Sequence, residues 1–328
     1  MRLKTKFVSR ITSVETVKKL TFLTVVVLVL STVFSLFGRY RYFELFTHFR
    51  LQYAWLALIC VVVSVVLRFW KISLLVAVCA LFNVWQIAPY YYPSAAAPRR
   101  ENNQSKINLR LMSANVQGNN KNYQGLIEAV ESVNPDVLVL LEVTENWRAN
   151  VQVLDSEYRY SKIEPRAGGS GLAVFSRYRI ESADVLTLDA SNQPALFCKI
   201  NLESTLLSVL IMHPPTPMRA DKFSYRNGQF SQAASIMKNA SEPKLLVGDF
   251  NTTMWSPYFA DLVKDTGLRD ARTGRGLYPS WNAALPAFFG IPIDHCLVGD
   301  KIEVESFETG NYTGSDHRSL ILNVRIEK

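Results

Sequence analysis

The run Leu245-Leu246-Val247-Gly248-Asp249-Phe250-Asn251-Thr252-Thr253 decides how the rest of this sequence is interpreted. An apolar segment with the character of a strand ends at Gly248, and a carboxylate and a carboxamide follow two positions apart. Alternate side chains of an extended chain leave the same face, so Asp249 and Asn251 share a face. Asp249 can orient or deprotonate a water, and Asn251 can donate a hydrogen bond to a substrate oxygen. Gly-Asp-Phe-Asn is equally typical of a simple turn after a buried strand.

Three apolar runs in the first third of the chain have the length and composition of membrane-spanning helices. They cover residues 20–37, 51–67 and 72–89, and each has 17 or 18 residues without a charged side chain. A helix of about this length crosses a bilayer, and buried helices of a soluble protein fit such runs less well. We therefore expect three transmembrane helices.

Basic residues beside these runs predict their orientation. Six precede the first run, and Arg68 and Lys71 separate the second run from the third, whereas Arg39, Arg41 and Arg50 lie between the first two. The positive-inside rule then places the N-terminus in the cytoplasm. Three crossings leave the rest of the chain outside, which in a bacterium is the periplasmic side of the inner membrane.

The positive charge of the protein is concentrated in the same part of the chain. Residues 1–100 carry 13 basic and two acidic residues, whereas residues 101–328 carry 23 basic and 26 acidic residues, a net charge of −3. The basic pI of about 9.3 therefore says little about nucleic acid. A local basic patch of Arg219, Lys222 and Arg226 is still compatible with this distribution.

The sequence divides into a membrane anchor at 1–92, a Pro- and Ala-rich linker at 93–105 and a soluble domain at 106–328. The soluble domain mixes strand and helix patterns in one unit, which predicts an α/β (α+β) layered sandwich. Cys198 and Cys296 lie in strand-like runs and are expected as small buried thiols, although a disulfide between them is permitted outside the cytoplasm. Strands are expected at 107–116, 136–141, 171–176, 195–202, 206–212, 244–247, 293–298 and 320–326, and helices at 123–133, 221–240 and 257–266.

Polar side chains stand where several of these strands end. Asn115 closes the first strand, and Glu142 closes the second after a run of apolar residues. A charged residue in that position usually marks only the point where a sheet meets solvent. Asp294 lies inside an apolar strand, where a carboxylate needs a partner to offset the cost of its burial.

The histidines fall at the same kind of position. Of the four in the protein, His213 follows an apolar run, His295 follows Asp294, and His317 follows Asp316 directly before the last strand. One such histidine alone is usually a hydrogen-bonded structural residue, and His295 is expected to be structural. Three together indicate a site.

Three motifs and two single residues stand here in a characteristic order: Asn-Pro-Asp-Val-x-x-x-x-Glu at 134–142, Gly-Asp-Phe-Asn at 248–251, Ser-Asp-His at 315–317, with Asn115 and Asp294. Residues 107–328 thereby resemble the endonuclease/exonuclease/phosphatase superfamily, the fold of DNase I. The sequence departs at Leu141, where many members have Gln. The resemblance implies a four-layered α-β-β-α sandwich, here preceded by three transmembrane helices, with its site in a cleft at the tops of two packed sheets.

The resemblance also implies a metal. Glu142 resembles the main ligand of a divalent cation, Mg²⁺ or Mn²⁺, with Asn115 and Asp316 beside it. Oxygen ligands suit such a hard ion. The glycine-rich run at 168–171 leads into a strand and lacks a following Lys-Ser/Thr, so it is expected to be a flexible turn and not a phosphate-binding loop.

The remaining residues match catalytic positions of the superfamily. Asp249 is similar to the residue that positions the attacking water, and Asn251 to the one that stabilises the phosphorane-like oxygens. His317 resembles the catalytic histidine, and Asp294 would hold the orientation of its ring. His213, in a His-Pro-Pro context, matches a histidine that contacts phosphate or protonates the leaving oxygen.

These features predict a membrane-anchored, metal-dependent hydrolase of phosphate esters with its site outside the cytoplasm. A nuclease that acts on DNA or RNA is the alternative enzyme, and a catalytically dead scaffold is the alternative outside enzymes. The net charge of −3 is atypical of a protein that grips duplex DNA, so a lipid or envelope phosphate ester is the preferred substrate. The expected partners are the bilayer and this substrate, with nucleic acid possible and no protein partner.

Large aromatic side chains lie close to the motifs. Trp255 follows the Asp249 motif, and Trp281, Phe288 and Phe289 precede Asp294. They could line the cleft for an apolar substrate, stack on bases, or belong to the core.

Overall fold

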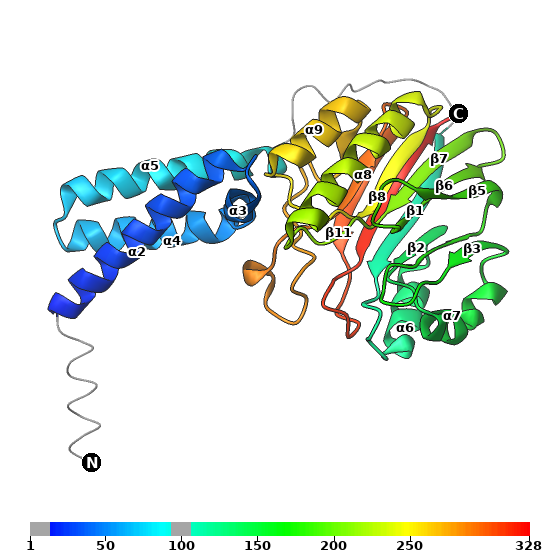
Figure 1. The fold of residues 1–328 in the computed structure, drawn as a ribbon, viewed down its shortest axis with the longest axis horizontal. Coiled ribbons are helices and arrows are strands. Elements are labelled where there is room, and N and C mark those ends of the chain that lie inside the picture. Colours follow the sequence, from blue (N-terminus) through cyan, green and yellow to red (C-terminus); the bar gives the residue numbers. More distant parts are fainter. Residues whose placement is uncertain (1–13, 93–105) are drawn as a thin grey trace, which may run out of the picture. The chain divides into compact units, whose positions relative to one another are not determined.

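The computed structural model describes residues 14–92 and 106–328 of the chain (Figure 1). The chain divides into two compact units, Met1–Ala88 and Pro89–Lys328. The linker predicted at 93–105 lies outside the described residues, as do the four basic residues before residue 14.

The first unit is helical. Its long helices are α2 (Val14–Phe34), α4 (Arg50–Val66) and α5 (Trp70–Ile87), with the short α3 (Arg41–Glu44) between the first two. Two stretches are long and apolar enough to cross a membrane, Glu15–Phe37 and Trp70–Tyr90. The middle run qualifies only if α4 and the preceding segment Arg41–Thr47, bent by 63°, count as one span. The structure thus supports two of the three predicted spans by length and composition, and a third only in this bent form.

The second unit contains two six-stranded mixed sheets, and helices cover the outer face of each (Figure 1). In the first sheet the order is β11 (Ile302–Thr309), β12 (Leu320–Glu327), β1 (Lys106–Asn115), β2 (Val137–Leu141), β4 (Leu172–Ser176) and β3 (Tyr160–Glu164). In the second it is β5 (Arg179–Thr187), β6 (Pro194–Asn201), β7 (Leu206–Met212), β8 (Lys244–Asp249), β10 (Asp294–Val298) and β9 (Arg269–Asp270). The helices are α6 (Tyr123–Val133), α7 (Glu145–Asn150), α8 (Ala220–Asn239) and α9 (Pro257–Thr266).

Strand β2 shows how the layers form. Val137 and Val139 belong to the apolar core shared by the two sheets, whereas Leu138 and Leu140 belong to a second core with residues of α6 and α7. Because both faces of β2 are buried, its sequence is continuously apolar and does not alternate. The result is a two-sheet α/β sandwich, as predicted.

Strand directions bring the polar strand ends to one edge. Strands β1 and β2 are parallel, with Asn115 opposite Leu141, and β7 is parallel to β8. Strand β10 runs antiparallel to β8, so that Asp294 stands opposite Asp249. The ends of four strands and the start of a fifth therefore meet on the same side of the sandwich.

All the predicted helices and strands of the soluble domain are present. The predicted ranges for α6, β7 and α9 agree with the structure to the residue. The prediction omitted β3, β5, β9, β11 and α7, which are short or have a partly exposed face. Cys198 and Cys296 are buried free thiols, as expected.

Gly248 shows how closely β7 and β8 approach each other. A Cβ atom at this position would lie 1.9 Å from the carbonyl oxygen of Met212, which is a backbone atom and cannot rotate away. We expect Gly248→Ala to lower the free energy of unfolding by about 3 kcal/mol or more, because the strands must separate. Equilibrium urea unfolding measures this effect.

Gly228, in α8, supplies the matched control. A Cβ atom there would meet nothing within 4 Å. Gly228→Ala should stabilise the protein by about 0.5–1 kcal/mol, because Ala is the better helix former. A Gly248→Ala protein as stable as the parent would contradict the packing of β7 on β8.

Candidate active site

Asp249 lies at the centre of the polar strand ends. The residue is 1% exposed, and its Oδ1 accepts a hydrogen bond from the backbone N–H of Asn251 at 2.9 Å, which closes a tight turn. Its Oδ2 faces Nδ2 of Asn115 at 3.2 Å, Nε2 of His213 at 3.4 Å and Nε2 of His317 at 3.6 Å. One carboxylate oxygen thus gathers groups from both sheets.

His317 lies between two buried carboxylates. Its Nδ1 is 2.7 Å from Oδ2 of Asp294, and its Nε2 faces Asp249. Burial alone would lower the pKa of His317, but the carboxylates of Asp294, Asp249 and Asp316 raise it to about 10. Burial and the neighbouring Asp294 raise the pKa of Asp249 to about 6, against the opposite effect of His317 and His213. At neutral pH, a cationic imidazole therefore bridges two carboxylates.

Glu142 follows β2 and is held by the backbone around it. Its Oε2 accepts a hydrogen bond from the N–H of Gly118 at 3.0 Å, and its Oε1 accepts one from Nδ2 of Asn115 at 3.0 Å. Its φ of 63° is unusual for Glu and costs roughly 1–3 kcal/mol, which the surrounding contacts must offset. A Cβ atom at Gly169 would lie 3.1 Å from Oε2, so the predicted glycine turn packs against this carboxylate.

The side chains of Glu142, Asn115 and Asp249 together fit a hard divalent cation. The amide NH₂ of Asn115 lies between the carboxylates of Glu142 and Asp249, where positive charge is favoured. Within residues 14–92 and 106–328, no Lys or Arg forms an ion pair with Glu142. Carboxylate and amide oxygens are the ligands that Mg²⁺ prefers.

A second group also has the spacing of a metal site. One ligand atom from each of Asp249, Asp294 and His317 lies within 4.8 Å of the others. However, Nδ1 of His317 is already hydrogen-bonded to Asp294. A hard cation prefers oxygen ligands to a histidine nitrogen. The oxygens near Glu142 therefore make the better candidate metal site.

Asp316 is linked to Asn115 by two hydrogen bonds through Gln117. Its backbone N–H donates to Oε1 of Gln117 at 3.2 Å, and the N–H of Gln117 donates to Oδ1 of Asn115 at 3.0 Å. Its carboxylate accepts a hydrogen bond from Nε1 of Trp281 at 3.2 Å. Sequence reasoning missed Gln117 and gave Trp281 no hydrogen-bonding role.

Asn251 and His213 lie on the other side of Asp249. Asn251 has a φ of 50°, a left-handed conformation that Asn tolerates better than most residues, and its Nδ2 donates to the carbonyl of Pro214 at 3.0 Å. This hydrogen bond fixes the side chain of Asn251 and leaves the second N–H of its amide to donate to a ligand. Within residues 14–92 and 106–328, the buried Nδ1 of His213 has no hydrogen-bond partner, which is rare and typical of functional positions.

A buried arginine supports the site from behind. Arg272 is fully buried, and its guanidinium donates to the carbonyl of Asp294 at 2.7 Å and to Nδ1 of His295 at 3.0 Å. Arginine can only donate, so Nδ1 of His295 accepts and its proton lies on Nε2, which donates to the carbonyl of Thr252 at 2.8 Å. His295 is therefore structural, as expected, and it joins β10 to the loop after Asp249.

The basic patch that Arg219, Lys222 and Arg226 could have formed lacks Arg226, because only the first two are exposed. Arg226 is fully buried, with its guanidinium 5.2 to 5.6 Å from the ring centroids of Phe223, Phe230 and Tyr258. Its Nη1 reaches the carbonyl of Asn251 at 3.4 Å. Arg226 therefore cannot contribute to a surface patch, because the aromatic side chains around it enclose the cation.

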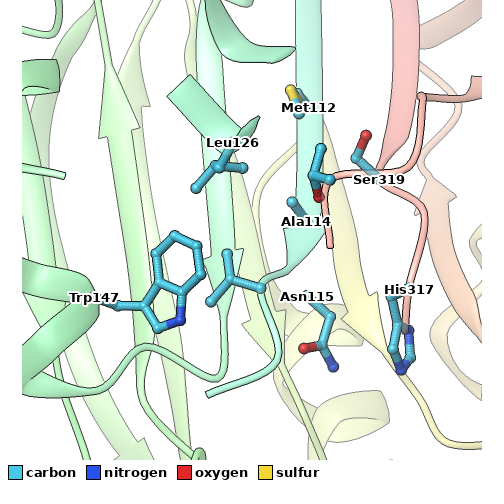
Figure 2. A pocket seen from close by; sticks show the side chains of 9 residues that line it. Met112, Ala114, Asn115, Leu126, Trp147, His317 and Ser319 are labelled. Carbon is cyan, nitrogen blue, oxygen red and sulfur yellow. The ribbon is translucent and has the colours of Figure 1, made fainter. Parts of the chain in front are cut away.

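A small pocket borders the site at Asn115 and His317 (Figure 2). Figure 2 shows Leu126 and Trp147 across from these two residues. Because apolar side chains form most of its lining, this pocket is a gap in the packing behind the site and not a place for a phosphate ester.

Comparisons with known proteins agree with this geometry. The model of the endonuclease/exonuclease/phosphatase family matches residues 112–317. None of the curated proteins matches the chain.

Several solved structures share the fold. An endonuclease/exonuclease/phosphatase from Beutenbergia cavernae has 17% identity and a TM-score of 0.57, over 67% of this chain and 72% of its own. The protein of the same description from Bacteroides vulgatus has 17% identity and a TM-score of 0.57, over 68% and 100%. TDP2 from D. rerio, in complex with a single strand DNA product, has 16% identity and a TM-score of 0.55, over 66% and 98%. At such identities the likeness shows the fold alone.

His295 predicts how stability depends on pH. Burial and the neighbouring Arg272 hold the pKa of His295 well below its usual value of 6.5. The unfolded chain therefore binds a proton below pH 6.5 that the folded protein does not, so this residue makes stability fall as the pH falls. His295→Gln keeps a donor for the carbonyl of Thr252 but does not titrate.

Urea unfolding of the parent and of His295→Gln at pH 7.5, 6.5 and 5.5 measures this effect. At pH 7.5 the parent should be the more stable protein by about 1–3 kcal/mol, since Arg272 loses an acceptor in the variant. Between pH 6.5 and 5.5 this difference should shrink by up to about 1.4 kcal/mol. A difference that stays constant over the whole range would show that His295 does not titrate in this way.

Proposed function

Since this chain belongs to the endonuclease/exonuclease/phosphatase family, we propose that it is a divalent-metal-dependent hydrolase of phosphate esters that is held at a membrane. The observation that carries the proposal is the convergence of Asn115, His213 and His317 on one oxygen of Asp249, with Glu142 hydrogen-bonded to the same Asn115. Hydrolysis of a phosphate ester needs an oriented water, stabilised equatorial oxygens and a protonated leaving oxygen. This cluster has a group for each.

Glu142 would hold the cation, with Asn115 and Asp316 beside it. When bound, Mg²⁺ or Mn²⁺ supplies positive charge that stabilises the negative charge of the phosphate oxygens. The backbone donor Gly118 and the left-handed conformation of Glu142 fix the carboxylate before any ligand binds. The site is thereby preorganised, which lowers the cost of ordering it during the reaction.

Asp249 would accept the proton of the attacking water. Its pKa of about 6 suits a base that works near neutral pH. As the oxygen–phosphorus bond to water forms, the bond to the leaving oxygen breaks, and His213 would contact the phosphate or donate a proton to that oxygen. Asn251 would donate its remaining amide N–H to a phosphate oxygen.

His317 would act as a fixed cation beside the phosphate. Its pKa of about 10 keeps it protonated at neutral pH, and its hydrogen bond to Asp294 orients the ring. Nε2 can then donate to a phosphate oxygen while Asp294 balances the charge. This division of roles separates the base, Asp249, from the electrostatic stabiliser.

A lipid or another phosphate ester of the cell envelope is the substrate that these observations favour. The net charge of −3 over residues 101–328 does not favour binding to duplex DNA. Burial of Arg226 removes one member of the basic patch that a nuclease could have used, and Arg219 pairs with Asp221 at 3.0 Å. Two apolar helices in the same chain would hold the enzyme near lipid.

We expect Mg²⁺-dependent hydrolysis of phosphate esters by the full chain in detergent micelles. Glu142→Gln, Asp249→Asn and His317→Ala should each lower turnover by about 100- to 10,000-fold, because each removes a metal ligand, a base or a fixed charge. EDTA should abolish activity, and Mg²⁺ or Mn²⁺ should restore it. The assay compares lipid phosphates, phospholipids, a generic phosphodiester, plasmid DNA and single-stranded DNA.

Exposed acidic residues provide the matched controls for these variants. Glu145→Gln and Asp221→Asn alter side chains that are 73% and 43% exposed, and they should leave turnover unchanged. Turnover that survives both EDTA and His317→Ala would refute the proposed mechanism. Efficient plasmid nicking that is lost in Asp249→Asn and unmatched by any lipid would make the enzyme a nuclease.

The catalytic unit is proposed to lie outside the cytoplasm, on the periplasmic side of a bacterial inner membrane. The support is the excess of basic residues before the first apolar run and between the second and third. Alkaline phosphatase fused after Pro98 should be active, and a green fluorescent protein fused there should be dark, because each folds on only one side. The opposite pair of results would reverse the orientation.

A further inference from the structure

The loop before β10 combines an exposed apolar tip with a base that belongs to the candidate active site. Residues 284–289, Ala-Leu-Pro-Ala-Phe-Phe, are all exposed, and no charged residue occurs between Gly276 and Ile293. Large apolar side chains are exposed at seven positions between residues 106 and 328, and three of them are in this loop: Leu285 at 45%, Phe288 at 39% and Phe289 at 57%. An exposed cluster of this kind usually marks a contact surface.

The tip is an ordered turn. The N–H groups of Leu285, Phe289 and Gly290 donate to the carbonyls of Asn282, Pro286 and Ala287 at 2.9 to 3.1 Å. The rings of Phe288 and Phe289 pack edge to face, with their centroids 5.1 Å apart. Because these three backbone donors are already satisfied inside the loop, the tip loses fewer hydrogen bonds to water when it enters an apolar medium.

The base of the loop is joined to the site. Trp281 forms β-bridges with Ile291 and His317, and its Nε1 donates to the carboxylate of Asp316. The N–H of Ala283 donates to the carbonyl of Asp316 at 2.8 Å. The apolar tip is therefore connected by a few residues to two groups of the site.

We propose that this loop inserts its tip into the interface of the lipid bilayer, so that the enzyme acts on phosphate esters in the headgroup region of membrane lipids. The membrane is the medium that fits the tip best. A stable protein interface needs about 800 Å² from each partner and a polar rim with hydrogen bonds, whereas this tip is six residues without a charged or hydrogen-bonding side chain. A bilayer needs only a few inserted apolar side chains.

Apolar helices in the same chain would keep this loop close to a bilayer. Two of the chain's helices are long and apolar enough to cross a membrane, so the second unit stays tethered close to lipid. A tether makes even weak insertion effective, because the loop meets the membrane at a high local concentration. The substrate class rests on the proposed function, whereas insertion of the loop can be measured without any turnover.

Spin labelling of the full chain in phosphatidylcholine nanodiscs tests the insertion. The four native cysteines are all buried, so a nitroxide will label an exposed cysteine selectively. Phe289→Cys carries the label in the tip, and Val153→Cys is the matched control, because the native side chains are 57% and 55% exposed. Collision with oxygen, which concentrates in lipid, is compared with collision with a water-soluble nickel chelate.

The label at position 289 should collide more with oxygen and less with the chelate than the label at position 153. Equal ratios at the two positions would overturn the proposal. Spin–spin broadening at position 289 that vanishes on dilution with unlabelled protein would show that a second copy covers the tip, which would also overturn it.

A double substitution tests whether the loop is needed for hydrolysis of a lipid substrate. Leu285→Asn combined with Phe289→Asn should lower the turnover of a lipid phosphate in vesicles by about tenfold or more, since insertion is lost. Turnover of a small water-soluble phosphodiester should be unchanged, because neither residue belongs to the catalytic group. An equal fall on both substrates would contradict the proposal.

The two proposals fail in different ways. If the parent hydrolyses neither substrate, the proposed function fails, and the label at position 289 still decides whether the loop inserts.

Discussion

The buried carboxylate of Asp249 is the constraint on which this site depends. It lies at the junction of the two sheets, and burying a carboxylate costs several kcal/mol unless donors surround it. The donors come from Asn115 at the end of β1, His213 after β7 and His317 before β12. Because Asn115 and His317 belong to the other sheet, Asp249 is fully compensated only when the two sheets pack together. Closure of the sandwich and assembly of the site are therefore coupled.

A second buried carboxylate, in register with Asp249, adds to the cost of burying charge in the site. Asp294 stands opposite Asp249 on β10, and two buried like charges at this spacing repel each other. His317 lies between them, and the charges of both carboxylates hold its proton. The same protonated ring that offsets the repulsion can donate to a phosphate oxygen. Stability and chemistry thus make the same demand on this histidine, and a substitution there affects both.

The sequence was most informative for polar residues that follow a buried, continuously apolar strand. Asn115, Glu142 and Asp249 were predicted from their motifs at strand ends and from the family resemblance. The structure brings them to one edge because β1 is parallel to β2 and β7 to β8. Arg272 could not be predicted, since the groups that hydrogen-bond its guanidinium lie 22 and 23 residues away and an arginine in a turn normally faces water. Burial of Arg226 was also hidden, because the aromatic residues that enclose it include one from another helix. Strand β11 was missed although its residues alternate between buried and exposed.

Trp281 links the candidate site to the exposed loop, because it belongs to both. Its indole holds the carboxylate of Asp316, and its backbone pairs with His317 on one side and Ile291 on the other. A displacement of the tip is therefore coupled to the site through backbone pairs and one hydrogen bond. A contact that fixes the tip would hold Asp316 and His317 in place as well.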